Sequence, residues 1–194
     1  MTQSNARTMR RTATLVFAGL LAGSWPRAAS VHASASAAQT SRSARIEGPF
    51  FSDAGGIATH VIEAINRTRH TLDIAMYDLT EPDITRALVA ARRRGVRIRI
   101  VADVGQAGDP YSKIADLRSQ GIGVRLSQGF NGERSLMHDK FAVFDGELAV
   151  TGSFNWTTSG ERYNSENAVF ISDSTVAARF EKEFEILWRR ARSQ

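Results

Sequence analysis

The chain has 194 residues, a formal net charge of +5 and no cysteine. The absence of cysteine excludes a disulfide framework and a catalytic thiolate. Four arginines and no acidic residue fall within residues 1–38, so the rest of the chain carries a formal charge of only +1. Composition alone therefore gives no reason to expect a nucleic-acid partner, and any basic site must be local. The arginines between positions 92 and 99 are the candidates.

The first 38 residues have the layout of a secretory signal peptide. Arg7, Arg10 and Arg11 precede an apolar run at 15–22, and an alanine- and serine-rich stretch with small-x-small cleavage candidates follows. The apolar run is far shorter than the ~20 residues that a membrane span needs. We therefore expect removal of the leader and export, to a periplasm or out of the cell. An uncleaved anchor or a disordered tail is the alternative interpretation.

Residues 39–45 are expected to form a flexible lead-in to one domain at 46–194, which is long enough to bury a core. Helices and strands alternate in its first half. Periodicity and capping signals predict, in chain order, a helix from Ile57 to Ile65, a strand at 72–77, a helix from a capping box at Thr80–Asp83 to Gly95, a strand at 96–101, a short helix ending near Gly121 and a strand at 122–126.

The second half begins with a polar, glycine-containing loop at 127–135 and continues with a β-hairpin. A strand at 167–171 follows, and then a helix that is capped by Asp173 or Ser174. This order of elements predicts a layered α/β/α domain with a mixed β-sheet.

The hairpin at 136–157 carries more chemistry than any other segment. Its turn signal is Asp145-Gly146, which lies between two apolar runs. A two-residue loop at this position pairs Phe144 with Glu147. The run at 141–144 is apolar on both faces, so its strand should be central and buried. We assign Asp145 to turn geometry and fold stability, and not to proton transfer.

Strand alternation in this register places four polar side chains on one face of the hairpin: His138, Lys140, Ser153 and Asn155. A nucleophile, a cation and two small hydrogen-bonding groups on one face indicate a phosphate pocket. Tyr77 and Asp78 end a predicted strand and are weaker candidates to line the cleft. His60 and His70 belong to no comparable pattern, so we interpret both as structural.

The pattern His138-x-Lys140, with Asp145 and Gly152-Ser153 after it, resembles the HKD signature of the phospholipase D superfamily. Four further segments resemble its small, single-motif bacterial endonuclease branch: Asp73–Tyr77, Arg94–Ile98, Ser153–Thr157 and Asn164–Asn167. The resemblance therefore extends over nearly all of the chain after the leader, and it implies a phospholipase D-like fold.

The resemblance also implies a metal-independent phosphodiesterase that needs no cofactor and forms a covalent phosphohistidine on His138. It implies that Glu166 holds the imidazole in its reactive tautomer. Lys140 would stabilise charge on the non-bridging phosphate oxygens, with hydrogen bonds from Ser153 and Asn155. Gly152, like Asp145, would have a structural role in the motif.

This chemistry requires a second histidine to protonate the leaving oxygen. Only His138 lies in a His-x-Lys pattern, and the chain contains no internal repeat. We therefore predict a two-fold homodimer whose active site spans the interface, with each His138 facing its symmetry mate.

The leading hypothesis for the substrate is DNA, with RNA as a further option, cleaved with little sequence preference because a phosphate-centred groove reads the backbone. Arg92, Arg93, Arg94 and Trp156 are candidate nucleic-acid contacts. The arginines also suit a helix C-terminus, and burial is the simpler interpretation of the tryptophan. One alternative is a phospholipase D that hydrolyses phosphatidylcholine or cardiolipin. A non-enzymatic nucleic-acid-binding or scaffold protein is the other.

Overall fold

The computed structural model describes residues 44–132 and 134–192. The expected signal peptide at 1–38 lies outside these residues, as does most of the expected lead-in at 39–45. Among the described residues, no helix combines the length and the apolar character needed to cross a membrane.

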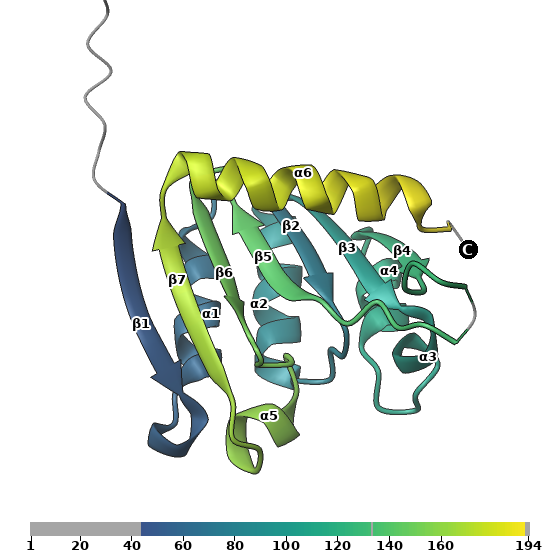
Figure 1. Cartoon of the computed structure of the whole chain (residues 1–194), viewed down its shortest axis with the longest axis horizontal. Coiled ribbons are helices and arrows are strands. Elements are labelled where there is room, and N and C mark those ends of the chain that lie inside the picture. The colour runs from purple at the N-terminus through teal and green to yellow at the C-terminus, as the bar shows by residue number, and fades with distance from the viewer. Residues whose placement is uncertain (1–43, 133, 193–194) are drawn as a thin grey trace, which may run out of the picture. The chain divides into compact units, whose positions relative to one another are not determined.

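In this part of the chain, a mixed sheet of seven strands has the order β1-β7-β6-β5-β2-β3-β4 (Figure 1). The strands are β1 (Arg45–Phe51), β2 (Thr71–Met76), β3 (Arg97–Asp103), β4 (Gly123–Ser127), β5 (Lys140–Phe144), β6 (Leu148–Gly152) and β7 (Asn167–Ser172). β2, β3 and β4 are parallel, whereas β5, β6, β7 and β1 extend the sheet from β2 as an antiparallel series.

Helices cover both faces of the sheet (Figure 1). On one face lie α1 (Ile57–Arg67), α2 (Pro82–Arg93) and α4 (Ile114–Ser119), and α6 (Ser174–Arg190) crosses the strands on the other. Three short helical segments lie in the connections: η1 (Ser52–Ala54), α3 (Val104–Ala107) and α5 (Thr158–Arg162). The predicted layered α/β fold is therefore confirmed.

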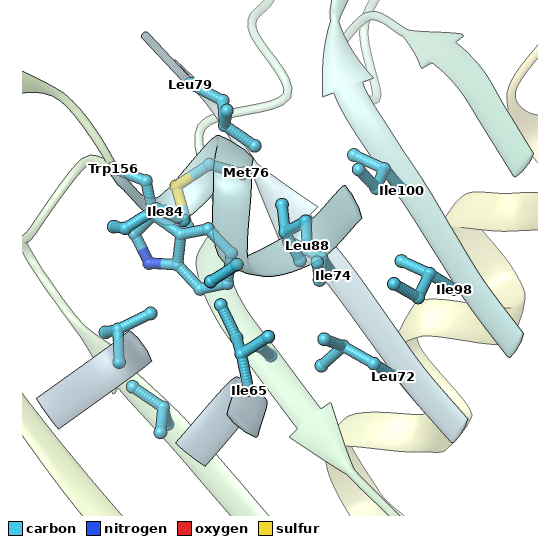
Figure 2. Packing of buried hydrophobic residues seen from close by; sticks show 14 of the residues in the cluster. Ile65, Leu72, Ile74, Met76, Leu79, Ile84, Leu88, Ile98, Ile100 and Trp156 are labelled. Carbon is cyan, nitrogen blue, oxygen red and sulfur yellow. The ribbon is translucent and has the colours of Figure 1, made fainter. Parts of the chain in front are cut away.

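Strand β2 separates two hydrophobic cores. Leu72, Ile74 and Met76 point toward α1 and α2 and are at most 1% exposed (Figure 2). Ala75, one residue out of phase, packs with Phe184 of α6. Because both faces of the strand are covered, its sequence is nearly continuously apolar, as expected for a central strand.

A partly buried ionic cluster joins the sheet to α6. Arg99 on β3 pairs with Asp73 on β2 at 2.7 Å, and with Glu181 and Glu185 of α6 at 3.2 and 2.7 Å. Burial and the neighbouring Asp73 carboxylate raise the pKa of Glu181 to about 8. Arg99 is therefore committed to this cluster and is not free to serve a basic surface site.

The sequence did not predict β1. Its segment contains Gly48 and Pro49, which normally break a strand. β1 nevertheless pairs with β7 as an edge strand, and its register shifts between Glu47 and Phe50, so the pair lies at an irregularity. The short helices α3 and α5 were also not predicted. The cap of α2 differs as well: the side chain of Glu81, and not that of Thr80, accepts from the backbone of Asp83.

The predicted register of the β5–β6 hairpin was wrong by one residue. Phe144 pairs with Leu148 and not with Glu147, because the turn holds three residues. Asp145 and Gly146 both have positive φ, 51° and 68°, as the sequence signal requires. Glu147 is the extra residue, and β6 is consequently shifted against β5. The single polar face predicted from simple alternation therefore does not follow from the observed pairing.

Proximity of the polar residues arises instead from the sheet edge. β2 and β6 end at the same edge at which β5 and β7 begin. Tyr77 and Ser153 directly follow β2 and β6 at this edge, and His138 and Glu166 come just before β5 and β7, so the four residues flank four adjacent strands. α2 returns the chain to the opposite edge, where β3 starts at Arg97.

Candidate active site

His138 and Lys140 lie where the chain enters β5. Lys140 is paired with Met76 on β2, and the next residue of that strand, Tyr77, donates its backbone N–H to the Asp139 carbonyl at 3.0 Å. The His138 side chain is exposed, whereas that of Lys140 is partly buried. Strand pairing thus holds the backbone of Lys140 in place, while the His138 imidazole is exposed to solvent.

The ammonium group of Lys140 contacts His138 directly. Its Nζ lies 3.2 Å from the imidazole Nδ1 and donates to the His138 carbonyl at 2.8 Å. Burial lowers the pKa of Lys140, although the carboxylates of Glu166, Asp139 and Asp78 act in the opposite direction. A partly desolvated cation beside an exposed imidazole is suited to receive a phosphate group.

Two acidic residues beside the pair are themselves perturbed. Burial, and then the charge of Asp109, raise the pKa of Asp78, while Lys140 lowers it. Burial likewise raises the pKa of Asp139, against the influence of Lys140 and His138. Neither Asp78 nor Asp139 has an oxygen bonded to His138, so we assign no proton transfer to them.

The β6 end of the site is built around Gly152 and Ser153. A side chain at Gly152 would overlap the backbone oxygen of Asn167, so only glycine fits between β6 and β7. The Ser153 hydroxyl accepts from the backbone N–H and the side-chain amide of Asn167, at 3.1 and 3.3 Å. The Asn155 Oδ1 is buried and has no hydrogen-bond partner among the described residues.

Glu166 lies at the same sheet edge, immediately before the first residue of β7. Its backbone is anchored by Ser52, whose hydroxyl accepts from the Glu166 N–H at 2.8 Å. Its carboxylate accepts from the side chain of Asn164 at 3.2 Å. The hydrogen bond to His138 that the resemblance implied is not made in this structure, where Lys140 lies beside Nδ1 instead. The tautomer-holding role of Glu166 stays a prediction.

Asp145 lies at the opposite edge of the sheet from His138. Its carboxylate accepts three backbone N–H groups, from Arg69, His70 and Thr71, at 2.7 to 2.9 Å. Burial acts to raise the pKa of Asp145, but these bonds dominate and lower it. The Asp145 carboxylate therefore connects the hairpin turn to the start of β2.

The other candidate residues lie away from this site. Trp156 is 2% exposed and packs in the core beneath β2, so its indole is not available to stack on a base (Figure 2). Arg92 and Arg94 donate to backbone carbonyls of Gly121 and Ile65 at the far edge. Arg93, with them, is exposed at the end of α2. Nucleic-acid contact by these arginines stays a prediction and would be remote from His138.

Three further residues support the site. Tyr77 was only a weak candidate from the sequence, and Gln106 and Asp103 were not candidates. Tyr77 packs its ring against His138, with centroids 4.5 Å apart. Gln106 donates to the Tyr77 hydroxyl at 2.9 Å. Asp103, 1% exposed, accepts from the backbone N–H of Met137, the residue before His138, at 3.0 Å. An acidic residue at the end of a buried strand was the available signal for Asp103.

A cleft of about 690 Å³ opens beside His138. Apolar side chains and two arginines of the C-terminal segment line it, namely Val104, Phe130, Leu136, Arg190 and Arg192 among others. The Arg190 guanidinium lies 5.2 Å from the centre of the Phe130 ring. Within the described residues, no three His, Asp or Glu side chains gather closely enough to hold a metal ion.

Known proteins resemble the chain over most of this fold. The family model described as cardiolipin synthase, PLD-like domain, matches residues 61–188. A mitochondrial cardiolipin hydrolase from Xenopus laevis is 38% identical over 120 residues, and its human counterpart is 34% identical over 132. These matches cover 62% and 68% of this chain. The chain spans only 55% and 51% of those relatives' own lengths.

Solved structures also resemble this chain. Nuc from Salmonella typhimurium, described as a phospholipase D family member, superposes with a TM-score of 0.71 at 32% identity. That match covers 78% of this chain and 98% of Nuc. NucT from Helicobacter pylori has the same TM-score at 21% identity, which supports the fold alone. With the His138–Lys140 pair at the sheet edge and a family model over most of the domain, the chain belongs to the phospholipase D-like superfamily of phosphodiesterases.

Proposed function

We propose that this protein is a metal-independent phosphodiesterase that cleaves nucleic acid through a covalent intermediate on His138. The observation that carries the proposal is the Lys140 ammonium, 3.2 Å from the His138 imidazole at an exposed sheet edge. It couples a nucleophile to the cation that would neutralise the phosphate under attack. The similarity to Nuc, a bacterial phospholipase D family member, at 32% identity over 98% of that chain, supports a small enzyme of the same family.

The first step begins when a phosphodiester draws Lys140 from His138 to a non-bridging oxygen. Once Lys140 no longer donates to Nδ1, the neutral imidazole takes the tautomer with its proton on Nδ1. The Nδ1–H donates to Glu166, and the lone pair of the other ring nitrogen attacks phosphorus. A P–N bond forms and the P–O bond to the leaving group breaks. The leaving oxygen takes its proton from His138 of the partner subunit. Lys140 and the Asn155 amide stabilise the charge that builds on the phosphoryl oxygens.

The second step returns the enzyme to its starting state. Water attacks the phosphohistidine, and the now neutral His138 of the partner subunit accepts a proton from it. A P–O bond forms, the P–N bond breaks, and a phosphomonoester leaves. The step needs two histidines on opposite sides of one phosphorus, which motivates the proposed two-fold homodimer.

Nucleic acid is the favoured substrate because of charge beside the nucleophile. Arg190 and Arg192 line the cleft next to His138, where they would contact phosphates flanking the cleaved one. These arginines would supply a local basic site beside the nucleophile, in a part of the chain whose formal net charge is only +1. Contacts to phosphates do not read bases, so we expect little sequence preference.

A phospholipid is the second candidate, and two observations favour it. The Xenopus laevis relative at 38% identity is named mitochondrial cardiolipin hydrolase. In addition, the same cleft exposes apolar side chains at Phe130, Leu136 and Val104, which are 76, 54 and 37% exposed. Acyl chains would suit these residues, and the chemistry at His138 would be unchanged.

A direct comparison distinguishes the substrates. Purified protein, with a metal chelator present, is offered supercoiled plasmid, single-stranded DNA, RNA, and vesicles of cardiolipin or phosphatidylcholine. We expect cleavage of the nucleic acids that disappears in His138→Asn and persists in His70→Asn, an exposed histidine at the far sheet edge. Release of phosphatidate without strand cleavage would show that the substrate is a phospholipid and not nucleic acid. A protein inert on every substrate would refute the catalytic proposal.

Subunit mixing tests the shared site. Wild-type protein and His138→Asn are combined in varying ratios and allowed to exchange subunits. If both imidazoles of a dimer are needed, activity falls with the square of the wild-type fraction, because only wild-type pairs work. A linear dependence would show that each subunit acts alone.

We also propose that the protein is exported. The arginines and the apolar run within residues 1–38 support this, as in a secretory leader. N-terminal sequencing of protein recovered from the periplasm or the culture medium should begin close to residue 39. Retention of the intact N-terminus in the cytoplasm would contradict export.

A further inference from the structure

The side chain of Tyr77 touches both members of the His138–Lys140 pair. Its ring centre lies 4.5 Å from that of His138, with the planes tilted by 56°. The Lys140 Nζ lies 5.0 Å from the same ring centre. One aromatic ring therefore limits how the imidazole can rotate and where the ammonium can rest, and its electron-rich face favours positive charge on either neighbour.

A hydrogen bond at the hydroxyl group holds the Tyr77 side chain in place. Its hydroxyl accepts a hydrogen bond of 2.9 Å from the side chain of Gln106 in α3. The backbone N–H of Gln106 donates to the buried carboxylate of Asp103, at 3.1 Å. The other oxygen of Asp103 accepts from Met137, directly before His138. A single buried carboxylate thus ties together the segment that positions Tyr77 and the segment that carries the nucleophile.

We propose that Tyr77, fixed by Gln106 and Asp103, is a positioning residue for His138 and Lys140. The inference rests on the proposed function, since it concerns the same reaction. When phosphate draws Lys140 away, the ring remains against the imidazole and keeps it aimed at phosphorus. As His138 gains positive charge during attack, the aromatic face stabilises it more than in the resting state. The ring should therefore affect kcat more than KM.

Three substitutions distinguish the effect of the Tyr77 ring from that of its hydrogen bond to Gln106. Tyr77→Leu removes the aromatic face, and we expect the single-turnover rate to fall about 30-fold or more while KM changes by less than about 3-fold. Tyr77→Phe and Gln106→Leu each remove one end of the same hydrogen bond, and each should cost about 3- to 10-fold. Because the bond is shared, the double variant should be no slower than the worse single variant.

Gln120→Leu is the matched control, because Gln120 is exposed at the end of α4 on the opposite side of the sheet. Rates are expressed per folded molecule, after melting curves establish that each variant folds. The imidazole nitrogen resonances of His138 give a second readout without turnover. In Tyr77→Leu and Gln106→Leu they should shift or broaden as the ring gains freedom, and in Gln120→Leu they should not.

Two results would overturn the inference. One is a Tyr77→Leu enzyme within about 3-fold of wild type with unchanged His138 resonances. The other is multiplication of the Tyr77→Phe and Gln106→Leu effects in the double variant. If wild type itself cleaves nothing, the proposed function has failed. The His138 resonances then still decide whether Tyr77 positions the imidazole.

Discussion

Asp145 should stabilise the fold and leave the chemistry untouched, although it belongs to the same sequence motif as His138. Its carboxylate accepts from the backbone of Arg69, His70 and Thr71, at the sheet edge opposite the active site. Asp145→Ala removes all three bonds and places alanine at a φ of 51°. Asp145→Asn keeps a residue that tolerates this conformation and retains one acceptor oxygen.

The expected magnitude follows from these contacts. Hydrogen bonds to a charged acceptor contribute roughly 1.5–3 kcal/mol each when buried. Two of the three bonds here are exposed, so we take about 1 kcal/mol for each bond. With about 1 kcal/mol for alanine in the left-handed region, Asp145→Ala should cost about 4 kcal/mol. For a domain of this size that lowers Tm by roughly 8–16 °C. Asp145→Asn should cost about 1–2 kcal/mol, because a neutral oxygen accepts more weakly.

The assay is urea or thermal unfolding together with turnover per folded molecule. Glu147→Gln, exposed in the same turn, is the matched control. Because the folded pKa of Asp145 is lowered, its contribution is present above the ordinary value of 3.8 and is lost as pH falls through the folded value. Wild type and Asp145→Asn should therefore converge in stability at strongly acidic pH. An Asp145→Asn protein with normal stability and turnover reduced more than about 100-fold would refute the structural assignment.

Three further predictions concern charge and packing. Because burial lowers the pKa of Lys140, activity should decline with rising pH at values below the ordinary 10.5 of lysine, and a pH–rate profile of Lys140→Arg should lack that decline. Gly152→Ala should destabilise the fold by about 1–3 kcal/mol in urea melts, since its methyl group would overlap the Asn167 backbone. The pKa of Glu181 is raised from 4.5 to about 8, so the stability linked to its protonation is lost as pH rises through 8. Glu181→Gln should flatten that loss in melting curves at pH 5 to 9, and an unchanged pH dependence would contradict the assignment.

The layered fold could be predicted because local signals agreed with the tertiary structure. β5 is apolar at each position from Phe141 to Phe144, and all four are buried in the middle of the sheet. Asp173 caps α6 through two backbone N–H groups, as its position before an apolar stripe suggested. By contrast, β1 contains Gly48 and Pro49 and depends on pairing with β7, a long-range contact that no local pattern records.

The sequence pattern placed His138 next to Lys140, but the predicted hairpin register differs from the observed one. His138 and Lys140 do lie in contact, but the one-residue register shift removes the simple reason given for bringing Ser153 to the same face. His138, Ser153 and Glu166 lie along one edge because four neighbouring strands end or begin there. The sequence does not indicate a role for Asp103 or Gln106, because that role depends on which residue each one contacts in the folded chain.

Chemical trapping of the covalent intermediate decides whether His138 is the nucleophile. Wild-type protein is mixed with a labelled phosphodiester, quenched in alkali within milliseconds, digested and analysed by mass spectrometry. We expect an acid-labile phosphoryl adduct on His138 that forms at least as fast as turnover and is absent from His138→Asn. Turnover without such an adduct, or an adduct on another residue, would contradict this expectation.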